Sequence, residues 1–306
     1  MKTIVSFFTN LHIVIFARLK ILLTGYNGLI GLALHRELLL QGHLIYCLGL
    51  SKPLLAAEKL YTTDLSTNWN INIIDESVDV VIHLAQSPHF REFPEKAEHI
   101  FNVNSLSTLK LCDYGVKVKI KQLVYTSSAG IYGFNEAKMM ESDEIFYNAN
   151  LGFYLGSKHI AESIVLNYNN FFNTVVLRPF FVYGQRQKRD MLVPRLIENI
   201  KNRNEISLKG ENGIWLNPTH VDDAATAIAN SLRLDKSEIV NIAGPEILSL
   251  RSICDIIGKQ VGIEPVFKVQ ESDEDEKLIG GIEKMSKLLH VPTITFSQGV
   301  LDFFEK

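Results

Sequence analysis

Cysteine is scarce in this chain of 306 residues, which contains only Cys47, Cys112 and Cys254. The three are far apart, odd in number and free of Cys-x-x-Cys spacing. This argues against a disulfide framework and against a zinc site, so we expect no metal centre. Unpaired thiols are typical of a reduced compartment, and we therefore expect a cytoplasmic protein.

A surplus of charge is also lacking. The net charge of −3 offers no general attraction to nucleic acid or to an anionic membrane, so we expect neither as a partner. The first 18 residues include an apolar run that is short for a spanning helix and contains Asn10 and His12. We expect residues 1–18 to be an extension that the fold does not require; a membrane-surface anchor and an export signal are the alternatives.

Apolar and polar residues do not alternate in the strand-like segments, which are continuous apolar runs. Such runs are typical of parallel strands that helices cover on both faces. Strand-like and helical segments alternate from Lys20 onward, which predicts an α/β fold with a Rossmann-like, doubly wound parallel sheet. We expect strands at 20–25, 44–50, 78–85, 122–128, 173–179 and 238–244.

The chain changes character after Pro179, where helical segments appear in new surroundings. We expect a dinucleotide-binding domain over residues 19–179, with returning elements at about 217–244. Residues 180–216 and 245–306 would form a smaller, discontinuous C-terminal substrate-binding region. In the returning part, Asp222 is the expected N-cap of a helix.

Glycines recur every three residues in "LLTGYNGLIG", directly after the first strand and at the start of the first helix. Gly25, Gly28 and Gly31 would give a tight turn, a close backbone approach to a pyrophosphate and a close contact between helix and strand. The helix N-terminus adds free N–H groups for the phosphates. This pattern predicts a dinucleotide site; a glycine-rich turn without a ligand is the alternative.

An acid is missing where NAD-binding folds usually have one, at the end of the second strand. No Asp or Glu lies between His43 and Pro53, and Gly49 stands at about the expected position. Ser51 offers a hydrogen-bond donor, and Lys52 offers a positive charge suited to a 2′-phosphate. The coenzyme is therefore NAD or NADP, and these residues tip the prediction towards NADP.

Tyr154 and Lys158 are four residues apart in a segment that we expect to be helical, so they share a face one turn apart. A dinucleotide fold followed by Tyr-x-x-x-Lys resembles the extended branch of the short-chain dehydrogenase/reductase superfamily, which includes the nucleotide-sugar epimerases and dehydratases. The resemblance covers nearly the whole chain from Lys20. It rests on "TGYNGLIG", "VIHLAQ", "VNSLST", "VYTSSAGIYG", "YLGSK", "LRPFFVYGQRQ", "HVDDAATAI" and "VNIAG", in this order.

The resemblance implies a catalytic set. A phenol with a pKa of about 10 is a poor base at neutral pH, but the ammonium of Lys158 and a positive nicotinamide ring would lower the pKa of Tyr154. Tyr154 would then move a proton while a hydride passes to or from the coenzyme. Lys158 would also hold the nicotinamide ribose. Ser128, with Ser127 as the alternative, would complete the site.

The same resemblance implies further contacts. Asn104 would bridge a helix to the sheet, and Tyr183 with Gly184 would shape the substrate side. The helix of Tyr154 and the one around residues 95–113 would pack a homodimer. The predicted substrate-binding residues are Ser87, Ser128 and Phe181. The predicted coenzyme-binding residues are Gly25, Asn27, Gly28, Leu29, Ile30, Gly31, Ser51, Lys52, Asp64, Leu65, Leu84, Ala85, Gln86, Tyr154 and Lys158.

Three departures from the family pattern bear on the reaction. Ala129 and Gly130 stand where the dehydratases carry an Asp-Glu pair, so dehydration is not expected. Phe181 replaces an Asn, and no arginine shortly precedes "HVDD". We expect an enzyme, an epimerase or ketoreductase of a sugar or sugar-nucleotide. An NADPH-dependent reductase of a non-sugar carbonyl compound is the alternative, and a non-catalytic dinucleotide-binding regulatory protein is the alternative of another class.

Overall fold

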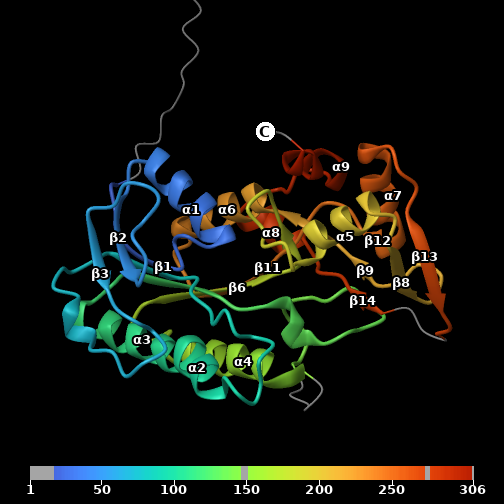
Figure 1. The fold of residues 1–306 in the computed structure, drawn as a ribbon. Helices are drawn as coiled ribbons and strands as arrows, with labels where there is room; N and C mark the ends of the chain where they lie inside the picture. Colours follow the sequence, from blue (N-terminus) through green and yellow to red (C-terminus); the bar gives the residue numbers. More distant parts are fainter. Residues whose placement is uncertain (1–16, 146–150, 273–275, 305–306) are drawn as a thin grey trace, which may run out of the picture.

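The computed structural model describes residues 17–145, 151–272 and 276–304. Its centre is a sheet of seven parallel strands in the order β11-β6-β5-β4-β1-β2-β3 (Figure 1). The strand order reverses beside β1, the point at which doubly wound sheets bind their ligands. The strands are β1 (Lys20–Thr24), β2 (Leu44–Gly49), β3 (Lys59–Thr62), β4 (Val80–His83), β5 (Gln122–Thr126), β6 (Asn173–Pro179) and β11 (Glu238–Ile242).

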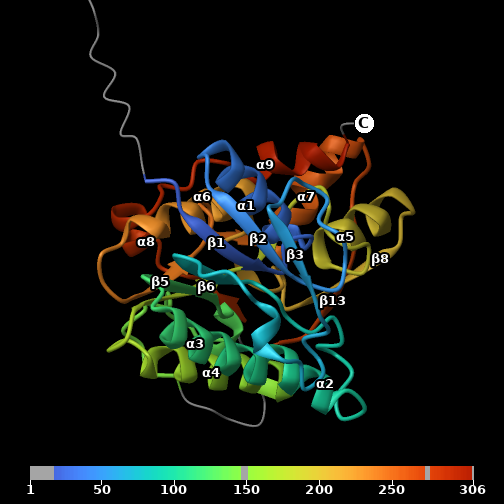
Figure 2. The same cartoon turned by 90° about the vertical axis from the view of Figure 1, so that its left-hand side faces the viewer.

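Helices cover both faces of this sheet, which confirms the predicted Rossmann-like architecture (Figure 2). One apolar cluster packs α1 and α6 on one face, and a second packs α3 and α4 on the other. Neighbouring strand residues alternate between the two clusters, so both faces of the sheet are buried and the central residues of the strands are mostly apolar. The covering helices are α1 (Leu29–Leu40), α2 (Ala97–Phe101), α3 (Ser107–Val118), α4 (Gly152–Asn167), α6 (Val221–Asn230) and α8 (Glu283–Leu288), with a π-helical turn at Asn102–Leu106.

The remaining elements pack around a third apolar cluster, on the right in Figure 1. All but β10, which lies at residues 219–220, belong to the two segments in which the sequence predicts the substrate-binding region, and the boundaries given there stay a prediction. These elements are α5 (Leu192–Lys201), α7 (Leu250–Val261), α9 (Phe296–Gly299), β7 (Val182–Tyr183), β8 (Glu205–Lys209), β9 (Trp215–Leu216), β10 (Thr219–His220), β12 (Leu248–Ser249), β13 (Val266–Gln270) and β14 (Lys277–Leu278). Short 3₁₀ helices lie at Ile71–Ile73, Ala129–Tyr132, Ser231–Arg233 and Val300–Phe303.

Two details of the sequence-based prediction need correction. The edge strand β3 was not predicted, because it is only four residues long and only Tyr61 in it is buried. Asp222 is not the N-cap of α6: the cap is His220, whose ring accepts a hydrogen bond from the backbone N–H of Asp222. Asp222 instead forms an ion pair with Arg36, at 2.7 Å.

Most of the predicted N-terminal extension, residues 1–16, lies outside the described residues. Across the described ranges, the structure has no helix that combines the length and the apolar character needed to span a membrane.

Candidate active site

The glycine cradle forms at the C-terminal end of β1. Gly25 has a φ of +70°, and a Cβ there would lie 2.8 Å from the backbone nitrogen of Ala85 at the end of β4. A Cβ on Gly31 would lie 1.9 Å from the carbonyl oxygen of Gly25. Only glycine fits at either position, so the tight turn and the close approach of helix to strand that a dinucleotide requires are both present.

A cavity of about 350 Å³ opens above this cradle. It extends from the N-terminus of α1 to the ends of β2, β3 and β4, which is the place of a coenzyme's adenosine half in such folds. Leu29, Ile30, Gly31 and Lys52 do not line it. The lining residues are Gly25, Tyr26, Asn27, Gly28, Leu48, Gly49, Leu50, Ser51, Thr63, Asp64, Leu65, Leu84, Ala85, Gln86, Pro88, His99 and Val103.

The carboxylate in this lining belongs to Asp64. It accepts hydrogen bonds from the backbone N–H of Ser66 at 2.8 Å and from the hydroxyl of the same residue at 2.7 Å. These bonds lower the pKa of Asp64. The carboxylate is thus ionised and fixed at the edge of the cavity.

Asn27 holds the loop that follows β2. Its side-chain nitrogen donates to the carbonyl of Lys52 at 2.9 Å, and its side-chain oxygen accepts from the N–H of Leu54 at 3.1 Å. Both polar ends of the amide are therefore occupied by the loop. The side chain of Lys52 is exposed.

Lys158 lies on α4 and is buried, with 1% of its surface exposed; like Tyr154, it does not line the cavity. Its Nζ donates to the carbonyl of Thr126 at 2.5 Å and lies 4.7 Å from the centre of the Tyr125 ring. Burial lowers the pKa of Lys158 to about 7, against the opposing influence of Glu162. Among the described residues, no carboxylate contacts this amine directly. The charge of the amine is therefore sensitive to a bound cation or anion.

Tyr154 stands one helical turn earlier on α4. Its hydroxyl donates to the side-chain oxygen of Gln86 at 2.7 Å, which connects it to the end of β4 and to the coenzyme cavity. Burial raises the pKa of the Tyr154 phenol. In the chain alone this direction is opposite to the one expected from the sequence, because desolvation disfavours the charged phenolate.

The two candidate serines differ in their surroundings. Ser128 is half-buried, and its hydroxyl accepts a hydrogen bond from the N–H of Gly130 at 3.2 Å, which caps the short helix Ala129–Tyr132. Ser127 is buried, and its hydroxyl has no hydrogen-bond partner among the described residues. Both follow β5 directly, so the structure brings them to the same edge of the sheet as α4.

Asn104 bridges two parts of the fold, as the sequence predicts. Its side-chain oxygen accepts from the N–H of Ser87 at 2.9 Å, and its side-chain nitrogen donates to the hydroxyl of Ser157 on α4 at 2.9 Å. Ser87 itself, predicted to contact substrate, is fully buried, with its hydroxyl 3.0 Å from the ring nitrogen of His99. In this structure Ser87 therefore has a structural place rather than a position open to substrate.

Phe181 and Tyr183 lie just beyond β6. Phe181 has a φ of 45° and packs, half-buried, against the third apolar cluster. Tyr183 is fully buried, and its hydroxyl lies 3.4 Å from the carbonyl of Thr295. Phe181 thus presents an apolar side chain where many family members have an amide.

A buried ion pair that sequence reasoning missed ties these elements together. The guanidinium of Arg178 on β6 is paired with both carboxylate oxygens of Glu162 on α4. It also donates to the hydroxyl of Tyr132 at 2.6 Å, and that hydroxyl donates to the side chain of Asn241 at 2.9 Å. A Glu one turn after Lys158 was the available signal, but its partner is 16 residues away on a strand.

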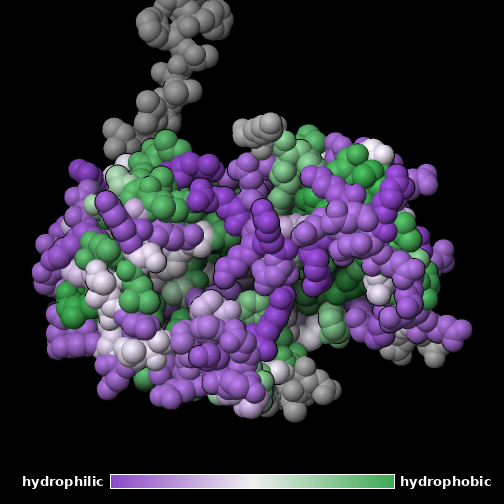
Figure 3. Space-filling view, in the orientation of Figure 1, coloured by the Kyte–Doolittle hydropathy of each residue, from purple (hydrophilic) through white to green (hydrophobic). Residues whose placement is uncertain are grey.

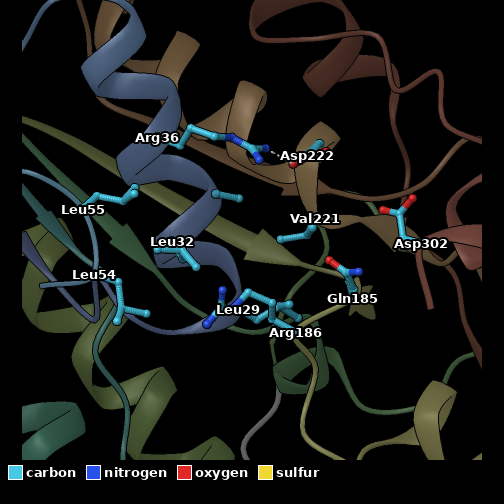
Figure 4. A pocket seen from close by; sticks show the side chains of 11 residues that line it. Leu29, Leu32, Arg36, Leu54, Leu55, Gln185, Arg186, Val221, Asp222 and Asp302 are labelled. Atoms are coloured by element: carbon cyan, nitrogen blue, oxygen red, sulfur yellow. Dashed lines mark hydrogen bonds and ion pairs between the residues drawn. The ribbon is translucent and has the colours of Figure 1, made fainter. Parts of the chain in front are cut away.

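A second cavity, of about 490 Å³, lies beside α1 (Figure 4). Leu29, Leu54 and Val221 contribute apolar side chains, and the ion pair of Arg36 with Asp222 crosses its rim. The loop after β2 separates it from the coenzyme cavity, since Leu50 and Ser51 line the first and Leu54 the second. In Figure 3, hydrophilic side chains cover the middle of this face of the molecule. None of the predicted catalytic side chains lines this second cavity.

The chain is similar to known proteins both in sequence and in fold. The sequence model described as "NAD dependent epimerase/dehydratase family" matches residues 21–243. An uncharacterized UDP-glucose epimerase of Bacillus subtilis is 28% identical over 307 residues, covering 90% of this chain and 94% of that protein. A UDP-glucuronate 4-epimerase of Thermodesulfobacterium geofontis is 26% identical over 250 residues, covering 79% of this chain and 77% of its own.

Among solved structures, the UDP-glucuronic acid 4-epimerase of Bacillus cereus in complex with UDP-glucuronic acid and NAD superposes with a TM-score of 0.81. The two chains are 25% identical, and the match covers 93% of this chain and 98% of the other.

Proposed function

This chain belongs to the NAD dependent epimerase/dehydratase family, and from that premise we propose that it is a nucleotide-sugar epimerase that works by reversible hydride transfer. It is an NAD-dependent enzyme of the extended short-chain dehydrogenase type. The observation that carries the proposal is the contact of Tyr154 with Gln86, because it places a phenol at the mouth of the coenzyme cavity, one turn from Lys158.

In the proposed reaction, the coenzyme and the residues of this chain have separate roles. The bound coenzyme supplies the group that takes up and returns a hydride. Tyr154 takes the proton from the sugar hydroxyl that is oxidised and gives it back to the ketone. Lys158 stabilises the phenolate by its charge, and the hydroxyl of Ser128 orients the reacting oxygen. Ala129 and Gly130 can move no proton, which supports epimerisation over dehydration.

The substrate we propose is UDP-glucuronate or UDP-glucose, with inversion at C4. Both relatives above carry one of these sugar nucleotides in their names. A ketoreductase is the second candidate, and Phe181 favours it because an apolar side chain replaces an amide that could bind a nucleotide diphosphate. The two candidates differ in whether coenzyme is consumed.

An NMR assay without added coenzyme separates them. Purified protein is mixed with each UDP-sugar in D₂O, and the proton at C4 is followed. An epimerase gives the C4 epimer with a protium at that carbon, because the hydride returns directly, and the coenzyme shows no net change. Conversion that requires stoichiometric NADH or NADPH would identify the reductase. Protein that retains NAD but converts neither sugar would contradict the proposed substrates.

The finer choice of coenzyme is part of the proposal. NADP is favoured by the missing acid after β2 and by Lys52, whose exposed side chain can reach a phosphate on the adenosine ribose. Lys52→Glu should then weaken NADP by about 1.5–3 kcal/mol, the range of a hydrogen bond to a charged group, and leave NAD nearly unchanged. Titration of both coenzymes into parent and variant tests this, and equal weakening of both would remove Lys52 from the site.

We also propose a homodimer, formed by the outer face of α4 with the segment around α2. A shallow apolar groove of about 280 Å³ lies there, lined by Phe101, Phe153 and Ile160 among others. Two of these side chains, Phe101 and Ile160, are exposed by 41% and 47%.

A further inference from the structure

The end of β2 leaves little room for the acid that it lacks, because a side chain there would meet a neighbouring side chain closely. A Cβ added to Gly49 would lie 3.1 Å from the hydroxyl oxygen of Tyr26, 3.3 Å from its Cε1 and 3.6 Å from its Cζ. The three atoms nearest to that Cβ all belong to this one ring. The ring of Tyr26 therefore occupies the space into which a longer side chain at position 49 would extend.

Tyr26 is fixed in this position. Only 3% of its surface is exposed, and its hydroxyl donates to the carbonyl of Ser51 at 2.5 Å. Burial raises the pKa of its phenol to about 12, so the ring is neutral. The next residue, Asn27, binds the same loop at Lys52 and Leu54. Two successive side chains of the cradle thus hold the loop after β2 against the coenzyme cavity.

Few charged side chains line the cavity in which we expect the ribose of the coenzyme to bind. Among the residues that line the cavity, Asp64 is the acidic one, and both of its bonds to Ser66 orient it at the end of β3. His99 lines the cavity from α2, and its pKa is lowered by burial and by the neighbouring His89, which favours the neutral ring. No carboxylate from β2 or its loop lines the cavity.

We propose that Tyr26 is a specificity-determining residue for the coenzyme: its ring takes the place of a ribose-binding acid and so makes the site tolerant of a 2′-phosphate. An acid at position 49 would accept hydrogen bonds from both ribose hydroxyls and repel a phosphate; a neutral ring whose hydroxyl is bonded to Ser51 does neither. Tyr26 and Gly49 act as a pair, because the absence of a side chain at one makes room for the ring at the other. The inference rests on coenzyme binding by the proposed enzyme and not on its sugar substrate.

The test is a set of four proteins: the parent, Gly49→Asp, Tyr26→Ala and the double variant with both changes. The dissociation constants of NAD and NADP are measured by titration, and melting temperatures report folding. The parent should bind NADP no more than about tenfold more weakly than NAD, because no acid at the end of β2 repels the 2′-phosphate. Gly49→Asp alone should lower the melting temperature and weaken both, because the new side chain meets the ring.

The double variant should recover NAD binding relative to Gly49→Asp and disfavour NADP by at least about tenfold more than the parent does. A matched control, Tyr26→Ala with Gly49→Asn, has the same shape without the charge and should not reject NADP to this extent.

Two results would overturn the proposal. One is a parent that already prefers NAD by more than about tenfold, a measurement that needs no variant to fold. The other is Gly49→Asp alone becoming NAD-selective at unchanged stability, since the ring would then be no obstacle. A parent that binds neither coenzyme would instead contradict the proposed function, and an active epimerase with either result above would contradict only the role of Tyr26.

Discussion

Tyr154 is the residue proposed to move the proton, and in the chain alone burial governs how firmly it holds that proton. Burial raises the pKa of its phenol, and the only hydrogen bond that its hydroxyl makes among the described residues is donated to Gln86. We therefore expect a proton to leave Tyr154 only when coenzyme and substrate complete the site. In the proposed mechanism, a sugar hydroxyl then replaces Gln86 as the partner of the phenol.

Replacing that phenol should separate binding from turnover. Tyr154→Phe removes one oxygen, so the fold and the coenzyme should be retained while kcat falls by roughly 10²–10⁴-fold, the usual contribution of a positioned acid–base group. The matched control is Tyr168→Phe, just beyond the end of the same helix, where the hydroxyl binds Asp113. Activity of Tyr154→Phe within about threefold of the parent would contradict the catalytic assignment.

The adjacent serines provide a test of register. Ser128→Ala removes a cap of one short helix and a hydroxyl at the site, so kcat should fall by about 10-fold or more with coenzyme retained. Ser127→Ala removes a buried hydroxyl that has no partner in the described structure and should have the smaller effect. Steady-state kinetics of both variants decide between them; the opposite order would make Ser127 the catalytic hydroxyl.

Lys158 should make stability depend on pH. Its folded-state pKa of about 7 lies below the ordinary value of 10.5, so the unfolded chain binds more protons between these two pH values. The free energy of unfolding therefore rises with pH across this window, and the cost of burying the charge is greatest below it. In coenzyme-free protein, Lys158→Met should raise the melting temperature relative to the parent at about pH 6, and less so at about pH 10. Lys188→Met, at an exposed site, serves as the control; an equal effect at both pH values would contradict the prediction.

At the residue scale, the sequence predicts the parts that depend on neighbours along the chain. The positive φ of Gly25 and the close contact of Gly31 with Gly25 follow from the motif, because both are dictated by one turn. The ring of Tyr26 against Gly49, and the phenol of Tyr154 on Gln86, could not be predicted, because each joins segments whose distance is set only by the assembled sheet. The burial of Ser87 could not be predicted either, because it depends on packing against His99 of α2.

Among the elements, α4 carries Tyr154, the proposed catalytic residue, so its attachment to the sheet matters for the proposed reaction. Arg178 and Glu162 provide that attachment, with side-chain exposures of 4% and 2%. The pair reaches Tyr132 as well, so one guanidinium connects the helix of Tyr154 with the turn that follows Ser128.

Removing one partner of the Arg178–Glu162 pair should lower the free energy of unfolding more than removing both partners does. Arg178→Met leaves a buried carboxylate unpaired and should lower the free energy of unfolding by about 3–5 kcal/mol, whereas adding Glu162→Met should recover a large part of that loss. Urea unfolding of the single and double variants measures the coupling. The exposed pair of Lys209 and Glu276 is the control and should contribute little. Strictly additive losses would show that Arg178 and Glu162 do not act together.

Strands were the most predictable elements, for a physical reason. The run 173–179 coincides with β6, because a strand covered on both faces has a continuous apolar centre, here residues 175–177. β3 was not predicted because an edge strand needs few apolar residues. The N-cap of α6 was assigned to Asp222 because the side chains of His220 and Asp222 can each accept a hydrogen bond from a backbone N–H.

For the whole molecule, the dimer is the principal prediction. Light scattering at micromolar concentration should give twice the mass of the chain, and Ile160→Glu should give the monomer, because a charge would enter an apolar contact. Ile247→Glu, at an equally exposed apolar residue with 52% exposure, is the matched control and should leave the mass unchanged. A parent of monomeric mass would contradict the interface.

The position of β11 at the edge of the large sheet has a consequence for biosynthesis. It pairs with β6, although residues 180–237 lie between the two strands. On the ribosome the cradle and strands β1 to β6 are made first. The edge of β6 that faces away from β5 keeps its N–H and C=O groups unpaired until β11 emerges. A nascent chain that stalls in this interval exposes an apolar parallel edge. The rate of translation through residues 180–242, and chaperone access during it, should therefore govern the yield of native protein.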